Sequence, residues 1–442
     1  MSSFVEFIKE NILYEILAVS WLLFFWRLYL NLRQRAFMMH LNNYPKSVED
    51  LMTKDIYEKA HSYLLDKLNF ANFKDICSEL FTTVFLLTLS YHRFWLWSID
   101  VVKYFGFDST NEILLSGVCM MLMNTFHEII FLPFKIYFTF VVEQKHGFNK
   151  ETPLFFVKDQ ILKYIVREII TVPLLCAILW IIKNMGDYCF LYLWIFLIIA
   201  TLFFMIIYPH VIAPLFDKYT PLPNGDLKTK IEALAASINY PLCKIFIVEN
   251  SKRSSHSNAY LYGFYKYKRI VLYDTLVKEY CKPAEGETEA KGCTTEEVLS
   301  VLAHELGHWK YSHTLKLFMF GQLHLLMNMY VYSKLMNFKP IFEAFGFMDT
   351  QPTFIGFIII TIYITSLPNV LLQFITTAIN RKFEFEADKF TKVLGHSQAL
   401  KSSLIKLEKD NLSYPLYDKL YSSYNHSHPQ ILERLEAVDK ED

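Results

Sequence analysis

The chain has 442 residues, 53% of them hydrophobic and 17% aromatic, and its formal net charge is zero at pH 7. This composition is too apolar and too poor in charge for an ordinary soluble enzyme, so it indicates a membrane protein. The balanced charge, without a dense basic run, argues against nucleic acid as a partner. Seven scattered cysteines without Cys-x-x-Cys spacing predict neither a disulfide framework nor a thiolate zinc site.

Apolar stretches long enough to cross a bilayer as helices recur along the chain, and they predict seven membrane spans. They are residues 12–32, 80–99, 113–142, 165–182, 188–208, 315–332 and 354–379. The second and third stretches contain ionisable side chains such as His92 and Glu128. Because charge is costly in lipid, we expect these side chains to face the protein interior or a wet cavity. The first stretch lacks a small-residue cleavage pattern and is expected to remain as an anchor.

Basic residues in the connecting loops predict the orientation of the spans, because loops rich in Lys and Arg remain cytosolic. Such residues are frequent after the first span, at positions 33–74, and after the third, at positions 145–163. The N-terminus is then outside and the C-terminus is cytosolic. The chain divides into the first five spans, a cytosolic domain, the last two spans and a cytosolic C-terminal part, at residues 1–208, 209–314, 315–379 and 380–442.

The cytosolic domain has a mixed pattern that predicts a small sheet. Residues 226–238 have the spacing of an amphipathic helix, 243–248 that of a short strand, and 258–267 with 269–273 that of a strand pair. An exposed edge strand that starts at Asn258 could hold an extended peptide by backbone hydrogen bonds. An ordinary hairpin packed on a helix explains the same pattern equally well. Residues 281–293 are predicted to form an exposed loop.

His304-Glu305-Leu306-Gly307-His308 spells His-Glu-x-x-His within residues 296–311, a run with the apolar spacing of a helix. A Thr cap at 294–295, followed by two acidic residues, marks the start of this helix. Residues four apart share one helix face, so both imidazoles can bind one ion while Glu305 lies beside the water on that ion. This is the pattern of a zinc hydrolase.

A catalytic zinc site needs a third protein ligand, and residues 380–390 supply candidates. They have the pattern of a helix with Glu384 and Asp388 on one face. Glu384 could bind the metal while Asp388 accepts the free ring N–H of a ligand histidine. Glu386 points about 200° away from Glu384 at the helical repeat. An exposed charge at a helix end is the equally open alternative for Glu384.

Near the C-terminus, His428 and Arg434 belong to a His-rich turn and to a short helix predicted to begin at Pro429. They could stabilise an oxyanion if the chain folds back over the metal. From the residues alone, a surface cap with a solvated Arg is the favoured interpretation.

Taken together, these segments resemble the CAAX prenyl protease type 1 family of Ste24-like integral-membrane zinc proteases. The resemblance rests on blocks at residues 143–152, 212–222, 257–264, 268–276, 302–310, 383–388 and 427–435. It implies an all-α polytopic membrane protein, in which a seven-span helical barrel surrounds a large chamber. A small cytosolic α+β zinc metalloprotease domain accompanies the barrel, with the zinc site on the cytosolic side of the chamber.

The resemblance also implies roles for individual residues. One zinc ion per chain would be bound by His304, His308 and Glu384. Glu305 would be the general base and Asp388 would support a ligand. His428 and Arg434 would help hold the scissile carbonyl, and Asn258 would lie on the substrate-binding strand. Two departures from the family pattern are small: Glu386 stands where close relatives often have Gln, and Gln430 where many have a second Pro.

The implied substrates are prenylated CAAX-protein C-terminal tails, farnesylated or geranylgeranylated on Cys, which lose their last three residues. A prenyl chain can partition beside the barrel while the polar tail reaches the zinc. The resemblance implies a location in the bilayer of the endoplasmic reticulum and of the nuclear envelope, and we expect the chain to act as a monomer. An alternative is a quality-control endopeptidase for unprenylated, misfolded or translocation-stalled polypeptides. A non-catalytic scaffold or channel is a third possibility, but a structural zinc site has no use for Glu305.

Overall fold

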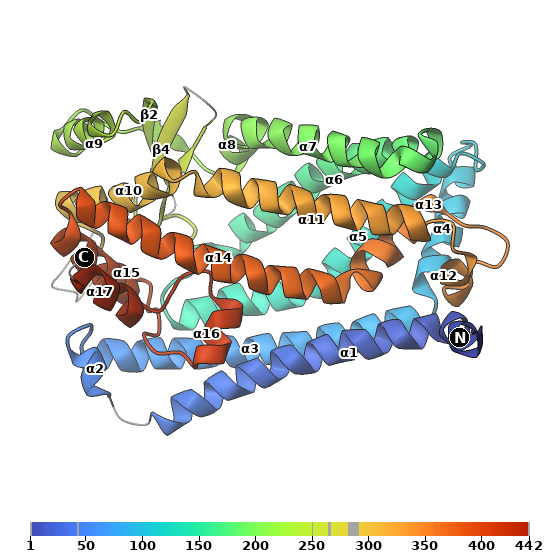
Figure 1. The fold of residues 1–442 in the computed structure, drawn as a ribbon, viewed down its shortest axis with the longest axis horizontal. Coiled ribbons are helices and arrows are strands. Elements are labelled where there is room, and N and C mark those ends of the chain that lie inside the picture. Colours follow the sequence, from blue (N-terminus) through green and yellow to red (C-terminus); the bar gives the residue numbers. More distant parts are fainter. Residues whose placement is uncertain (1, 42–43, 250, 264–266, 282–290, 441–442) are drawn as a thin grey trace.

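The computed structural model describes residues 2–41, 44–249, 251–263, 267–281 and 291–440. Its long helices lie side by side along the long axis of the molecule (Figure 1). They are α1 (Ser2–His40), α3 (Lys54–Leu87), α5 (Glu112–Tyr137), α6 (Pro153–Asn184), α7 (Cys189–Ile207), α11 (His313–Leu335) and α14 (Ser366–Val393). Short helices join or extend them: α2 (Lys46–Glu49), α4 (Ser90–Tyr104), α8 (Ala213–Phe216), α12 (Lys339–Ala344) and α13 (Thr353–Ile358). The π-helical segments are η1 (Phe138–Glu143), η3 (Tyr208–Ile212) and η5 (Ile359–Ile364), and the 3₁₀ turns are η2 (Gly186–Tyr188) and η4 (Lys278–Tyr280).

Four helical stretches among the described residues could cross a membrane by length and composition alone. They are Asn11–His40, Glu112–Glu143, Pro153–Asn184 and Gly186–Phe216. Thr353–Ile364 and Ser366–Val393, bent by 54° at their junction, make a fifth if the pair is one span. These stretches correspond to the predicted first, third, fourth, fifth and seventh spans.

The other two predicted spans do not meet the same criterion. Residues 80–99 are interrupted, because α3 ends at Leu87 and Leu89 adopts the left-handed φ of 52° before α4 begins. Residues 315–332 lie within the continuous helix α11, whose apolar character is diluted by polar side chains. Two of these, His324 and Asn328, hydrogen-bond with Asn369 of α14. Length and composition alone therefore identify four or five of the seven predicted spans among the described residues.

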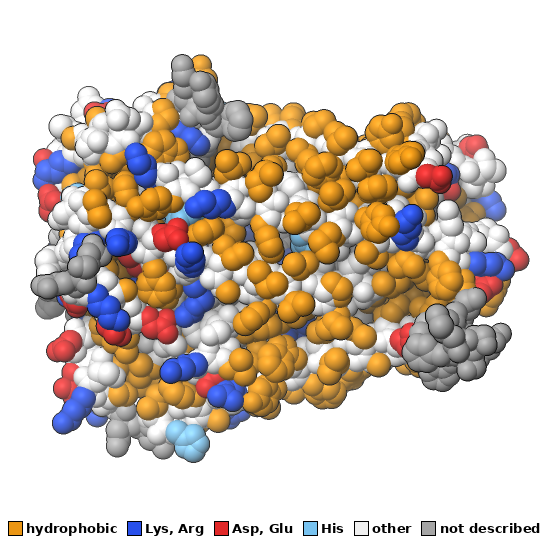
Figure 2. All heavy atoms as spheres, viewed as in Figure 1, with side chains coloured by type: hydrophobic (Ala, Val, Ile, Leu, Met, Phe, Trp, Pro, Cys, Tyr) orange, Lys and Arg blue, Asp and Glu red, His pale blue; other side chains and the backbone are white. Residues whose placement is uncertain are grey.

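The surface fits a protein embedded in a bilayer. Figure 2 shows hydrophobic side chains over the middle of the molecule, whereas charged side chains gather mainly at the end that carries the sheet and the C-terminal helices. Large exposed apolar residues on α7, α11 and α14 include Leu191, Ile195, Leu323, Met327 and Leu371. A broad exposed apolar surface marks contact with lipid or another apolar partner. The protein is a multi-pass membrane protein.

A four-stranded sheet lies at one end of the helices (Figure 1). Its strand order is β1 (Tyr219–Pro221), β2 (Leu242–Val248), β4 (Lys268–Tyr273) and β3 (Ala259–Tyr262), with β2 and β4 parallel and the other pairs antiparallel. A strand forms in each predicted segment, but β3 covers only residues 259–262 of the predicted 258–267; it is an edge strand. It ends at Tyr262 because Gly263 adopts a φ of 114°, which an L side chain rarely does. The three-residue β1 was not predicted, being too short for a pattern.

Apolar side chains of this sheet form one core with α9 (Asp226–Ser237) and α10 (Thr295–Lys310). Both helices were predicted, the first one residue longer than observed. Of the predicted loop at 281–293, residues 282–290 lie outside the described ranges, as do residues 264–266 of the predicted strand pair.

The C-terminal part consists of α15 (Ser397–Asp410), α16 (Lys419–Asn425) and α17 (Ile431–Asp439), and it packs against both α1 and α14. Arg33 of α1 donates to Asp418 at 2.7 Å, which holds the start of α16. The predicted helix at Pro429 begins at Ile431 instead, because Gln430 is its N-cap. The Gln430 amide also bonds with the backbone N–H and C=O of Tyr417. Packing of α16 and α17 against α14 places the C-terminal chain beside that helix.

Candidate active site

The His-Glu-x-x-His motif lies on α10, whose start has a complete capping box. The Glu297 backbone N–H donates to the Thr294 hydroxyl, and the Thr294 N–H donates to the Glu297 carboxylate. Each of these bonds satisfies a donor that the first turn of a helix leaves unpaired. Leu302 and Leu306 anchor the helix in the core that it shares with the sheet and α9. The predicted motif helix is confirmed, and its position is fixed at both its start and its buried face.

Helix α14 crosses α10 closely at Gly307. A Cβ atom at Gly307 would lie 3.0 Å from Cα and 3.2 Å from the carbonyl oxygen of Ala387. Those are backbone atoms, so they cannot move aside as a flexible side chain can. The glycine within the motif therefore allows the close contact that places Glu384 opposite the two histidines. Sequence reasoning did not single out Gly307, because the contact joins residues 80 positions apart in the chain.

Gly307→Ala is expected to lower the free energy of unfolding by roughly 1–3 kcal/mol, because the added methyl overpacks this crossing. Thermal unfolding of the protein in detergent would measure the loss. Gly321→Ala on α11 is the matched control, since a Cβ there meets nothing within 4 Å and alanine favours helix. Equal stability of the two variants would contradict the close-packing role.

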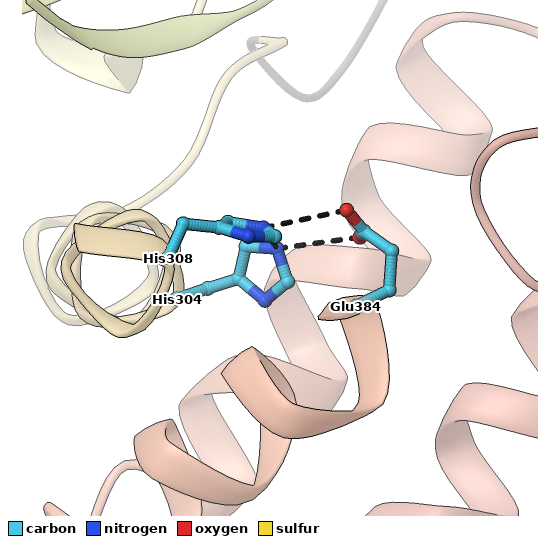
Figure 3. Close-up of side chains that lie close together, drawn as sticks. All are labelled: His304, His308 and Glu384. Atoms are coloured by element: carbon cyan, nitrogen blue, oxygen red, sulfur yellow. Dashed lines mark hydrogen bonds and ion pairs between the residues drawn. The ribbon is translucent and has the colours of Figure 1, made fainter. Parts of the chain in front are cut away.

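Three side chains from the two helices point toward one another (Figure 3). His304 Nε2 lies 3.1 Å from His308 Nε2, and Glu384 Oε2 and Oε1 lie 3.4 and 3.3 Å from these two nitrogens, respectively. Zinc bonds of 2.0–2.1 Å in a tetrahedron imply ligand atoms about 3.3 Å apart. Each imidazole nitrogen lies at about this distance from one of the two carboxylate oxygens, and one ligand atom from each residue lies within 4.8 Å of the others, so the three residues suit a zinc ion in position and in donor type. They are the His, His and Glu of the predicted ligand set.

Asp388, one turn after Glu384, makes the contact expected of it. Its Oδ1 lies 2.8 Å from His304 Nδ1, an arrangement in which the ring N–H donates to the carboxylate. The His304 Nε2 lone pair then faces Glu384 and His308. A carboxylate in this position fixes the tautomer and the orientation of a ligand histidine.

The position of Arg434 differs from the one that the sequence favoured, in which this arginine is solvated on a surface cap. Its side chain is buried, and Nε and Nη2 donate to the two oxygens of Asp388 at 2.8 and 2.7 Å. Nη1 lies 3.7 Å from Glu384 Oε2. A charge buried this deeply needs a partner, and the paired contact supplies one. Two of the three guanidinium nitrogens therefore hold Asp388.

His428 lies beside the carboxylate of the third ligand, Glu384. Its Nδ1 lies 2.7 Å from Glu384 Oε2, and 65% of its side chain is exposed. Arg381 of α14 donates to the His428 carbonyl oxygen at 3.3 Å and to Glu433 at 2.8 Å, so it holds the turn in place. Sequence reasoning did not identify this role of Arg381. His428 is the accessible polar group beside the site.

Glu305 lies on α10 between the two histidines of the motif. Burial raises the pKa of the Glu305 carboxyl, and the nearby imidazoles of His304 and His308 partly oppose that shift. A carboxyl with a raised pKa can take up and release a proton closer to neutral pH.

Asn258 directly precedes the edge strand β3, which packs against α10. Its backbone carbonyl accepts from Tyr273 N–H at 3.0 Å, so its described contacts are with the sheet.

Comparison with known proteins agrees with this geometry. The family model for the CAAX prenyl protease N-terminal region, five membrane helices, matches residues 34–218, and the model for peptidase family M48 matches residues 221–442. The fold and the site define a membrane metalloendopeptidase, and the chain belongs to peptidase family M48. That family implies a metal ion, typically zinc.

Within this family the chain is similar to proteins named CAAX prenyl protease 1 homolog. The Mus musculus protein is 43% identical and the Homo sapiens protein 42% identical, each over 97% of this chain and 96% of the relative. The crystal structure of S. mikatae Ste24p matches with a TM-score of 0.86 and 33% identity, covering 96% of this chain and 98% of that one. The predicted family resemblance is confirmed.

Proposed function

We propose that this protein is a zinc-dependent endopeptidase that removes the last three residues of prenylated CAAX proteins. The observation that carries the proposal is the convergence of His304, His308 and Glu384, one ligand atom from each lying within 4.8 Å of the others. Similarity to CAAX prenyl protease 1 homologs supports the class of substrate.

The residues divide the chemistry among them. When bound, a zinc ion supplies Lewis acidity that lowers the pKa of water and polarises a peptide carbonyl. Glu305 takes the proton of the attacking water and passes it to the leaving amine, so no covalent intermediate is needed. His428 donates to the oxygen that becomes negative in the transition state. Arg434 contributes mainly by holding Asp388, because two of its nitrogens are already bonded there.

The substrate occupies two regions in this proposal. The peptide tail extends along β3 beginning at Asn258, where the edge strand supplies backbone hydrogen bonds. The prenyl chain occupies a cavity of about 840 Å³ between α3, α5, η1, α6 and the C-terminal part. That volume lies within the range of ligand pockets. The apolar side chains that line it include Leu64, Leu68, Phe131, Phe134, Phe138 and Phe156.

The setting of the enzyme is part of the same proposal. A seven-span barrel encloses the chamber, and residues 209–314 and 380–442 lie on the cytosolic side. The basic residues at positions 33–74 and 145–163, many of which lie at the ends of α1, α3 and α6, support that orientation. The enzyme acts as a monomer in the membrane of the endoplasmic reticulum and of the nuclear envelope continuous with it.

Cleavage of a farnesylated CAAX peptide by the purified, zinc-loaded protein in detergent tests the proposal. We expect release of the last three residues, detected by mass spectrometry, and cleavage of the unprenylated twin at least about tenfold more slowly, because it lacks the apolar binding energy. A zinc chelator should stop the reaction and added zinc should restore it. Equal cutting of both peptides would favour the quality-control endopeptidase, and no cutting of either would favour the scaffold.

A further inference from the structure

In the second ligand histidine, His308, the ring nitrogen that faces away from the metal site has a different partner from that of His304. His308 Nδ1 lies 2.9 Å from Nδ1 of His313, and His313 Nε2 lies 2.9 Å from Oε2 of Glu386. His313 is 1% exposed and starts α11, whereas Glu386 lies on α14 between Glu384 and Asp388. Three segments of the chain therefore meet in one line of polar groups behind His308.

The backbone and one ring contact fix His313 in this line. Ser312 adopts the left-handed φ of 56° between α10 and α11, so the chain turns and brings His313 back beside His308. The His313 imidazole stacks on Phe383 with ring centroids 4.0 Å apart and an interplanar angle of 4°. The plane of the ring is thereby set, and its two nitrogens point in fixed directions.

The two contacts permit only one arrangement of protons when His308 is a metal ligand. Its Nε2 must then be bare, because that atom faces His304 and Glu384, and its proton is on Nδ1. This N–H donates to His313 Nδ1, which must also be bare. The proton of a neutral His313 is then on Nε2, where it donates to the Glu386 carboxylate. Every donor in the line has one acceptor.

We infer that His313 and Glu386 are positioning residues for the metal ligand His308. His313 accepts the His308 N–H, and Glu386 holds His313 in the tautomer that can accept it. This inference rests on the proposed zinc site. It extends the predicted role of Asp388 at His304 to the second histidine, through an intervening imidazole. Glu386 itself lies outside the ligand set, as its predicted direction on the helix required.

Asp388, which supports His304, and Glu386, which supports His308 through His313, differ in their surroundings. The role of Glu386 is therefore easier to test. Asp388 is buried and held by Arg434. The Glu386 side chain is 35% exposed, with Lys382 3.8 Å away. Replacing Glu386 should therefore disturb the fold much less than replacing Asp388, because solvent can reach the altered position.

Zinc affinity, measured by competition with a chelator on the purified full-length protein, tests the inference without using activity. His313→Phe keeps the ring that stacks on Phe383 but removes the acceptor, and we expect zinc affinity to fall by roughly 10–100-fold. Glu386→Leu should weaken zinc about tenfold, and Glu386→Gln, which keeps an acceptor oxygen, should remain within about threefold of wild type. Adding Glu386→Leu to His313→Phe should cause no further loss, because Glu386 acts through His313.

His324→Phe, the same substitution elsewhere on α11, is the matched control and should leave zinc affinity unchanged. Wild-type zinc affinity in His313→Phe would overturn the inference. Additive losses in the double variant would show that Glu386 does not act through His313. Equal losses in the Leu and Gln variants would overturn the acceptor role of Glu386. His304→Ala separates this outcome from failure of the proposed function: full zinc binding in that variant would show that the metal site itself is elsewhere.

Discussion

Replacing Glu305 with Gln is expected to lower kcat/KM by roughly 10²–10⁴-fold while zinc remains bound. The amide has nearly the same shape as the carboxylate, but it cannot take a proton from water. Glu305 is not among the three groups whose ligand atoms lie within 4.8 Å of one another, so the metal site should be intact. Cleavage of the farnesylated peptide and zinc content of the same preparation would check both statements.

Glu296→Gln is the matched control for this variant. Glu296 is in the first turn of the same helix, its side chain is 59% exposed, and it pairs with Lys230 on the surface. Activity should stay near that of wild type, because an exposed ion pair contributes little. Loss of zinc from Glu305→Gln, or substantial peptidase activity in it, would contradict the general-base assignment.

Local patterns in the sequence were sufficient to predict the elements that carry the site. The capped, proline-free run before His304 predicts α10, and the spacing of Glu384 and Asp388 predicts that both project from one face of α14. The strand pair was predicted from alternation and the Asn258 edge from its place in that pair. In each case the information lies within a few consecutive residues, which is the range over which helix and strand periodicity acts.

Contacts between distant segments were not predictable in the same way. Arg434 and Asp388 are 46 positions apart, and no local pattern indicates that this arginine is buried rather than solvated. His313 reaches His308 only because the chain turns at Ser312, where a non-glycine residue adopts a positive φ. The interruption at Leu89 in the second apolar stretch depends on a similar conformation. A hydropathy average over a long window does not show such a turn, since the polar residues Thr88, Ser90 and His92 are averaged with apolar neighbours.

Removing one partner of the buried Asp388–Arg434 pair is expected to destabilise the protein strongly. Asp388→Leu leaves the Arg434 guanidinium buried without its principal partner, and the free energy of unfolding should fall by about 3–5 kcal/mol. Chemical unfolding in detergent would measure this change. Lys401→Met, which breaks a more exposed ion pair between α15 and α17, is the control and should cost less than about 1 kcal/mol.

The double variant Asp388→Leu with Arg434→Met separates stability from metal binding. With both charges removed, no unpaired ion is left buried, so most of the lost stability should return. Zinc affinity should stay roughly 10–100-fold below wild type, because the His304 N–H still lacks its acceptor. Recovery of both properties would show that Asp388 is needed only to neutralise Arg434. Recovery of stability alone would establish that the Asp388 carboxylate is needed to orient His304 toward the metal.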